Sequence, residues 1–220
     1  MMRHARGLIG YFRRNVQTGQ EHFSISTQAD GSRTLRAECE MWDDVLLRDV
    51  TLAIDAQYRP LDAYIRLAQH GSFVGSSWYR FGAGWVECEA NTVRDGRVSQ
   101  RMDWHGWPVC FGTHSLITDA WHAVHWRGMD PPPMSSPVSS NAANGGTGPL
   151  ISTTSFLLSR VGLEQVRVPA GEFDCAHFTI AFRDYPPIHF WVTGNDHQFV
   201  RMEWGLLDAN YELLEFAETR

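Results

Sequence analysis

Residues 22–41, HFSISTQADGSRTLRAECEM, contain the pattern that decides the fold. In residues 33–41 the apolar side chains of Leu35, Ala37 and Cys39 alternate with charged ones, and residues 22–29 alternate in the same way. The dipeptide at positions 30–31, Asp-Gly, is a turn signal of β-hairpins. A period of two indicates strands with one buried face. The stretch therefore predicts two antiparallel strands of a half-buried sheet.

The same pattern continues along the chain on both sides of its middle. Further strands are expected at residues 49–56, 61–68, 73–81, 85–93 and 98–104, and then at 151–161, 164–168, 175–182, 188–193, 198–204 and 210–216. Short strands in series, separated by turn residues, are typical of hairpins. The sequence thus predicts two antiparallel meanders.

Length and charge bound the class of protein. The chain has 220 residues, 43% of them hydrophobic, which suits a single domain over residues 1–220 with a substantial core. The net charge of −6 argues against nucleic acid and anionic membranes as partners. The apolar run at residues 7–12 is shorter than the core of a secretory signal. We therefore expect a cytoplasmic protein, and a homodimer is one alternative for its assembly.

The middle of the chain departs from the strand pattern. Residues 113–126, THSLITDAWHAVHW, have a helical period, with Thr113 as the expected N-cap and Gly128 as the stop. We expect Ile117, Ala120 and Val124 to be buried against the sheet. Residues 130–149 contain five prolines, three glycines and four serines and read as a long loop without packing residues. Loops of this length are often lids, so we expect it to cover a cavity.

Histidines are concentrated in and near the expected helix. At 100° per residue, His114, His122 and His125 fall on one stripe, opposite an aliphatic one. Histidine is the commonest general acid or base. Asp103 and His105 lie two residues apart on an expected strand, so their side chains share a face. These five residues are the candidate catalytic groups, with a solvated histidine stripe as the alternative.

Metal and cofactor chemistry find little support in the sequence. His122 and His125 lie one turn apart, but His114 lies two turns from His122, on the order of 12 Å along the axis. A third ligand would have to come from a strand, for example His105 or His189, and no HExxH motif is present. The glycine-rich motifs of nucleotide-binding proteins are also missing from the sequence. We expect neither a metal ion nor a cofactor.

Nine tryptophans are unusual for a chain of this size. Aromatic side chains suit the walls of pockets that hold flat, apolar ligands. The candidate substrate-binding residues are therefore mainly tryptophans, together with an aromatic and basic pair that could hold an anionic group: Trp104, Trp107, Trp121, Trp126, Trp191, Tyr79 and Arg80. Core packing is the alternative role for each of them.

The last third of the chain carries a family resemblance. The stretches VRVPAGEFDCAHFTI and IHFWVTGNDHQFVRMEW resemble a family of uncharacterised bacterial all-β domains, similar in outline to lipoprotein-carrier half-barrels. The matched residues are turn and core positions: Val168, Pro169, Ala170, Gly171, Phe173, Trp191 and Asp196. The resemblance implies a strongly curved antiparallel sheet with a helix over its open side. It implies no catalytic role, because the matched positions are structural.

Together these observations predict an all-β half-barrel or barrel with one central helix covering an apolar cavity. The leading hypothesis for its function is a small enzyme that uses histidine acid–base catalysis on a hydrophobic, aromatic or polycyclic molecule, as an isomerase, lyase or hydratase. The alternative is a non-catalytic carrier of such a ligand. A purely structural domain is a third possibility, and histidines gathered around one concavity would argue against it.

Overall fold

The computed structural model describes residues 2–128, 133–183 and 185–219. Its strands are β1 (Arg3–Arg13), β2 (Val16–Thr27), β3 (Arg33–Met41), β4 (Leu46–Ile54), β5 (Pro60–Gln69), β6 (Ser72–Gly82), β7 (Trp85–Thr92), β8 (Gly96–Asp103), β9 (Met134–Val138), β10 (Ser152–Val168), β11 (Gly171–Ala181), β12 (Ile188–Thr193), β13 (Gln198–Trp204) and β14 (Ala209–Thr219). Its helical elements are α1 (Leu116–Trp121) and the short 3-10 helices η1 (His122–His125) and η2 (Gly205–Leu207).

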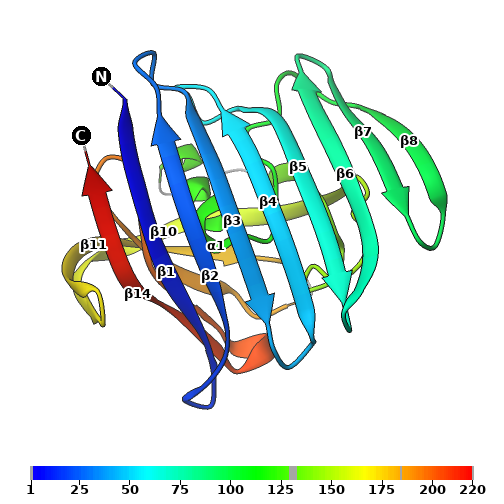
Figure 1. Cartoon of the computed structure of the whole chain (residues 1–220). Coiled ribbons are helices and arrows are strands. Elements are labelled where there is room, and N and C mark those ends of the chain that lie inside the picture. The colour runs from blue at the N-terminus through cyan, green and yellow to red at the C-terminus, as the bar shows by residue number, and fades with distance from the viewer. Residues whose placement is uncertain (1, 129–132, 184, 220) are drawn as a thin grey trace.

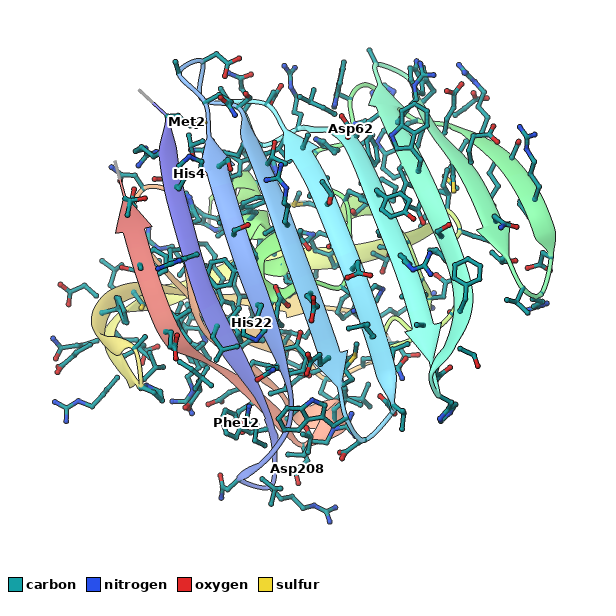
Figure 2. All side chains as sticks on the ribbon, in the orientation of Figure 1. Met2, His4, Phe12, His22, Asp62 and Asp208 are labelled. Atoms are coloured by element: carbon teal, nitrogen blue, oxygen red, sulfur yellow. The ribbon has the colours of Figure 1, made fainter. Side chains whose placement is uncertain are left out.

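The hairpin expected from alternation is present as β2 and β3. Phe23 lies opposite Ala37, and both side chains are buried, as the apolar positions of the pattern require. The residues that alternate with them along each strand point to the outer face. Figure 2 shows His22 of β2 and Asp62 of β5 at this surface. The prediction of half-buried antiparallel strands is therefore confirmed.

All fourteen strands belong to one sheet in the order β8-β7-β6-β5-β4-β3-β2-β1-β14-β13-β12-β11-β10-β9. Neighbouring strands run antiparallel throughout, which confirms the predicted fold class. Strand β1, which alternation did not predict, pairs with both β2 and β14. The pairing of β1 with β14 joins the two meanders in the middle of the sheet.

The sheet is strongly curved and folds back over the helical segment. In Figure 1, β1–β8 form the front layer, β10 and β11 pass behind it, and α1 lies between. Helix α1 packs against β12 and β13, and at its other side the backbone N–H of Leu116 donates a hydrogen bond to Glu21 of β2. Ile117 and Ala120 are almost fully buried. The helix thus occupies part of the inside of a half-barrel.

The helix is shorter than the sequence predicts. The expected span of residues 113–126 contains a six-residue α-helix followed by four residues of 3-10 helix. His114 has a φ of +61°, outside the right-handed helical region, so Thr113 is separated from the helix and is not its N-cap. Val124 is only half-buried. In the described parts of the chain, no helix is long and apolar enough to cross a membrane.

The Pro/Ser/Gly-rich segment is better packed than the sequence predicts. Of the expected loop at residues 130–149, positions 130–132 lie outside the described residues, and Met134–Val138 form strand β9 against β10. Pro137 is tolerated because β9 is an edge strand, where a missing N–H interrupts no ladder. Ser136 and Ser139 are buried, so small side chains here allow close packing.

Candidate functional site

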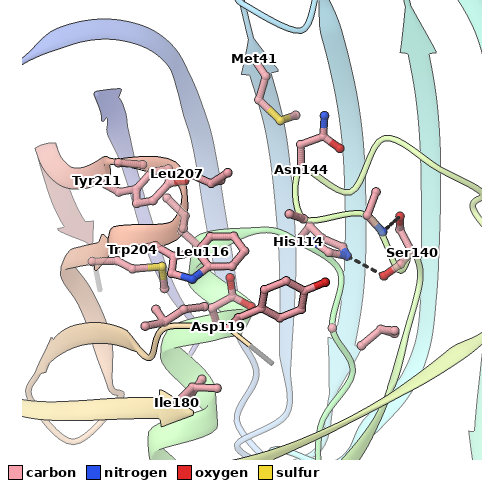
Figure 3. A pocket seen from close by; sticks show the side chains of 18 of the residues that line it. Met41, His114, Leu116, Asp119, Ser140, Asn144, Ile180, Trp204, Leu207 and Tyr211 are labelled. Carbon is pink, nitrogen blue, oxygen red and sulfur yellow. Dashed lines mark hydrogen bonds between the residues drawn. The ribbon is translucent and has the colours of Figure 1, made fainter. Parts of the chain in front are cut away.

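A cavity of about 390 Å³ lies inside the curve of the sheet (Figure 3). It is bounded by the ends of β1–β4, by α1 and η1, by residues 140–144, and by the inner faces of β9–β14. Binding sites for small molecules are commonly clefts of about 300–1,000 Å³. The volume of this cavity lies in that range, so it suits a small ligand.

One side of the cavity is apolar. Phe156, Ile180 and Met202 come from three strands of the second meander, and each is almost fully buried. They reach the cavity because alternate residues of β10, β11 and β13 point inward. Trp204 and Leu207 extend this wall toward the outside. In the following, the apolar wall means these five side chains.

Another side is built from the Ser/Gly-rich segment and held by a buried arginine. Arg48 donates one hydrogen bond to the carbonyl of His114 (3.0 Å) and another to the carbonyl of Asn144 (2.5 Å). His114 Nε2 lies 3.0 Å from the carbonyl of Ser140. Burial, helped by the charge of Arg48, lowers the pKa of His114 to about 4. His114 is therefore a neutral part of the wall, and Arg48 fastens residues 140–144 over the cavity.

Glu21 lies behind the helix and is completely buried. It accepts hydrogen bonds from Ser115 Oγ (2.6 Å) and from the backbone N–H of Leu116 (2.9 Å), at the beginning of α1. Tyr11 Oη (2.9 Å) and Cys39 Sγ (3.5 Å) are its other donors. Burial raises the pKa of Glu21, while the bond from Ser115 opposes that rise. This carboxylate fixes the N-terminus of the helix to β2.

Asp119, one turn further along α1, presents its carboxylate to the cavity (Figure 3). Among the described residues, no group donates a hydrogen bond to this carboxylate, and only the charges of neighbouring groups oppose its burial. Burial raises its pKa to about 6. Asp119 is half-buried, and it lines the cavity. Asp119 is therefore a hydrogen-bond acceptor at the cavity that has no donor among the described residues.

His122 also lines the cavity, edge-on to the ring of Phe156 with 5.2 Å between ring centroids. Its Nδ1 lies 3.0 Å from the carbonyl of Thr118 and 3.1 Å from that of Asp119. Because carbonyl oxygens only accept, Nδ1 is the donor in these contacts, and in the neutral ring Nε2 is the acceptor. His114 and His122 thus meet at one cavity together with a tryptophan, Trp204.

The other three candidate catalytic residues lie elsewhere. Asp103 and His105 are exposed at the end of β8, an edge strand outside the curve of the sheet, and no hydrogen bond joins them in the described structure. His125 is buried behind the cavity wall, with no partner for its Nε2 among the described residues. Burial lowers the pKa of His125 to about 3. The structure does not bring these three side chains to the cavity.

The seven candidate substrate-binding residues are also absent from the described cavity lining. Some hold other parts of the fold: Trp107 Nε1 donates to the carbonyl of Pro60, the guanidinium of Arg160 lies over Trp126, and Trp121 packs edge-on against Tyr58. Tyr79 is fully buried against Phe111, Arg80 lies over the rings of Trp78 and Trp85, and Trp104 packs half-buried beside the core. Trp204, which does line the cavity, was missed because nothing in its strand distinguishes it from the other tryptophans.

A polar cluster on the outer face of the second meander was not predicted either. His177 Nδ1 lies 2.9 Å from Glu164, and its Nε2 lies 3.0 Å from His189. The ring of His177 stacks on Trp191, whose Nε1 donates to Glu164 at 2.7 Å. The two nitrogens of His177 point to different partners. Within the described residues, no group of three or more His, Cys, Asp or Glu side chains is placed to hold a metal ion.

Comparisons with known proteins identify the fold. No protein-family model matches the sequence, and neither does any curated protein. The chain is similar to the structure of a β-barrel-like protein of domain of unknown function DUF1849 from Brucella abortus, with 12% identity, a TM-score of 0.56, and 100% of this chain and 98% of that chain covered. It is also similar to a candidate lipoprotein from Parabacteroides distasonis, with 8% identity, a TM-score of 0.40, and coverage of 97% and 94%. The resemblance to bacterial all-β half-barrels is thereby confirmed at the level of the fold.

Proposed function

We propose that the protein binds an apolar small molecule in the cavity and acts as its carrier. The observation that carries this proposal is a cavity of about 390 Å³ with an apolar wall, inside the curve of the sheet. Protein interiors are normally packed as densely as organic crystals, and voids reduce stability. A cavity of this size is therefore best explained by a ligand that fills it.

Filling the cavity by mutation tests this proposal. Ile180→Trp places a larger side chain in the apolar wall, and Leu163→Trp makes a matched change on the exposed surface of β10. The neutral dye N-phenyl-1-naphthylamine, which fluoresces in apolar sites, serves as the probe. We expect the wild type and Leu163→Trp to bind it with equal affinity, and Ile180→Trp to bind at least about tenfold more weakly. Binding that survives in folded Ile180→Trp would contradict the assignment, and circular dichroism checks the fold.

A second candidate function is catalysis on the bound molecule by His122. The specific observation in its favour is that the ring of His122, held through Nδ1 by backbone carbonyls, lines the same cavity as the carboxyl group of Asp119. A histidine and a carboxyl group at one cavity suit proton transfer in an isomerisation, elimination or hydration. No redox step is needed for these reactions.

The molecules that copurify with the protein distinguish a carrier from an enzyme. We would compare, by mass spectrometry, the small molecules extracted from the wild type and from His122→Gln. A carrier holds the same compound in both proteins. An enzyme that lacks its base accumulates a substrate, which differs from the wild-type compound by the mass of water or in its isomeric form. Identical compounds in both proteins would exclude catalysis by His122.

A further inference from the structure

The charges around the cavity are unequal in number. Five charged side chains line it: Arg13, Asp43, Asp44, Arg48 and Asp119. Two are cations and three are carboxylates. The whole chain is also acidic, with a net charge of −6. The electrostatic surroundings of a bound molecule therefore favour a positive group over a negative one.

Both cations are already engaged by the protein. Arg13 lies 3.8 Å from Asp43. Arg48 is buried and donates to two backbone carbonyls, those of His114 and Asn144. Arg13 therefore already faces a carboxylate, and two N–H donors of Arg48 already bond to backbone carbonyls. The described lining thus offers poor recognition for fatty acids and anionic lipids.

The carboxylates differ from one another in the same respect. Asp43 has Arg13, and Asp44 accepts a hydrogen bond from Asn144 Nδ2 at 2.9 Å. Asp119 has no donor among the described residues and lines the cavity together with the apolar wall. A carboxylate that is largely withdrawn from water and has no donor from the protein is unfavourable unless something pairs with it. The group best able to do so is a hydrogen-bond donor that carries a positive charge.

We propose that the ligand is an amphiphilic amine, with its ammonium group on the carboxylate of Asp119 and its hydrocarbon body against the apolar wall. This inference rests on the proposed binding function and names its ligand class. A cationic donor replaces the solvation that Asp119 loses on burial, and the wall accommodates the rest of the molecule. His122 lines the same cavity, and its Nε2 accepts a hydrogen bond from a second N–H of the ammonium group.

A matched series of probes tests this inference. Decylamine, decan-1-ol and decanoic acid share one chain and differ in the polar group. Their binding would be measured at pH 8 by displacement of the neutral dye, below the concentrations at which they form micelles. We expect decylamine to bind about tenfold to a hundredfold more tightly than decan-1-ol, and decanoic acid to bind most weakly.

Two variants locate the effect. Asp119→Asn keeps the shape of the side chain and removes its charge, so we expect the preference for decylamine over decan-1-ol to fall by at least tenfold while decan-1-ol binding is unchanged. Asp44→Asn is the matched control at the same cavity and should keep most of the preference. An equal loss in both variants, or no loss in Asp119→Asn, would overturn the assignment to Asp119.

The pH dependence gives a separate readout. The pKa of Asp119 is raised to about 6 by burial, so lowering the pH from 8 to 5 protonates the carboxylate and weakens amine binding. The charged or titratable groups that surround Asp119 are His122, Glu21, Arg48, Cys110 and Tyr211. Asp119→Asn retains His122, so the part of the pH dependence that it removes belongs to Asp119.

The outcomes separate the two proposals. If none of the three probes displaces the dye and the dye itself does not bind, the proposed carrier function is wrong. If decan-1-ol binds and decylamine binds no more tightly, the carrier function stands and the amine inference is wrong. An amine preference that Asp119→Asn retains at pH 8 also overturns the inference.

Discussion

Two carboxylates, one packed against the short helix α1 and one carried by it, have opposite surroundings. Glu21, on β2, receives four hydrogen bonds and holds the beginning of α1. Asp119, one turn along α1, receives none from the described residues and faces the cavity. Burial raises the pKa of both. The difference teaches that burial alone does not reveal the role of a carboxylate, whereas its hydrogen-bond partners do.

The two environments imply opposite contributions to stability. Satisfied buried polar groups fix one arrangement of the core, and an unsatisfied one reduces the free energy of unfolding. Functional sites commonly keep such unfavourable groups because the ligand needs them. Glu21 therefore should be required for folding, and Asp119 for binding.

The largest expected effect comes from removing the satisfied carboxylate. Glu21→Ala leaves the Ser115 hydroxyl and the Leu116 N–H buried without their acceptor, so we expect a loss of about 3–5 kcal/mol in the free energy of unfolding. Urea denaturation followed by circular dichroism measures it. Glu21→Gln, which keeps one acceptor oxygen, should lose less. A loss below about 1 kcal/mol for Glu21→Ala would break the comparison.

The next largest effect is expected for Arg48, which is buried and donates hydrogen bonds to two backbone carbonyls. Arg48→Met leaves the carbonyls of His114 and Asn144 without a donor, and we expect a loss of about 2–4 kcal/mol. Residues 140–144 should also become more accessible, which amide hydrogen exchange would detect. Unchanged exchange there would show that Arg48 does not hold this wall.

Asp119→Asn should act in the opposite direction. The folded-state pKa of about 6 lies above the ordinary value of 3.8, so ionisation of Asp119 disfavours the folded state above pH 6. We expect the ligand-free variant to be more stable than the wild type by about 1–3 kcal/mol at pH 8. The gain should shrink as the pH falls through 6 and disappear below about 4. Both proteins retain His114 and His125, so the acid instability of these histidines cancels in the difference.

The smallest effect is expected for His122→Gln. Glutamine can still donate to the carbonyls of Thr118 or Asp119, and little of the packing against Phe156 is lost. We expect a change within about 1 kcal/mol in thermal or urea unfolding. A much larger loss would place His122 with Glu21 as a structural residue and weaken the case for any role in the chemistry of the cavity.

Much of the fold could be predicted because alternation is a local signal. The hairpin of β2 and β3 shows it in its buried Phe23 and Ala37. Strand β1 was missed because a bulge between Leu8 and Ile9 interrupts its period, so that Ile9, Gly10 and Tyr11 are buried in succession. A bulge between Arg160 and Gly162 similarly divided the predicted β10 in two. Irregularities set by pairing across the sheet leave no local signal.

The site could be predicted only in outline. The histidine stripe pointed to a segment that does line the cavity, through His114 and His122. Nothing in the sequence singles out Asp119, because an acidic residue in the first turn of a helix is common for electrostatic reasons. The nearby donors, Ser115 Oγ and the Leu116 N–H, bond to Glu21 instead. These are contacts between residues far apart in sequence, which the sequence alone does not reveal.

The seam between β1 and β14 also orders events during synthesis of the protein. Strand β1 is made long before β14, and until then one of its edges has no neighbour. Open edges invite pairing with other chains, and the arginines at Arg3, Arg6 and Arg13 discourage it. Tyr11 of β1 and Tyr211 of β14 line the cavity with ring centroids 5.2 Å apart. A nascent chain therefore has no complete cavity until β14 has been synthesised and has paired with β1.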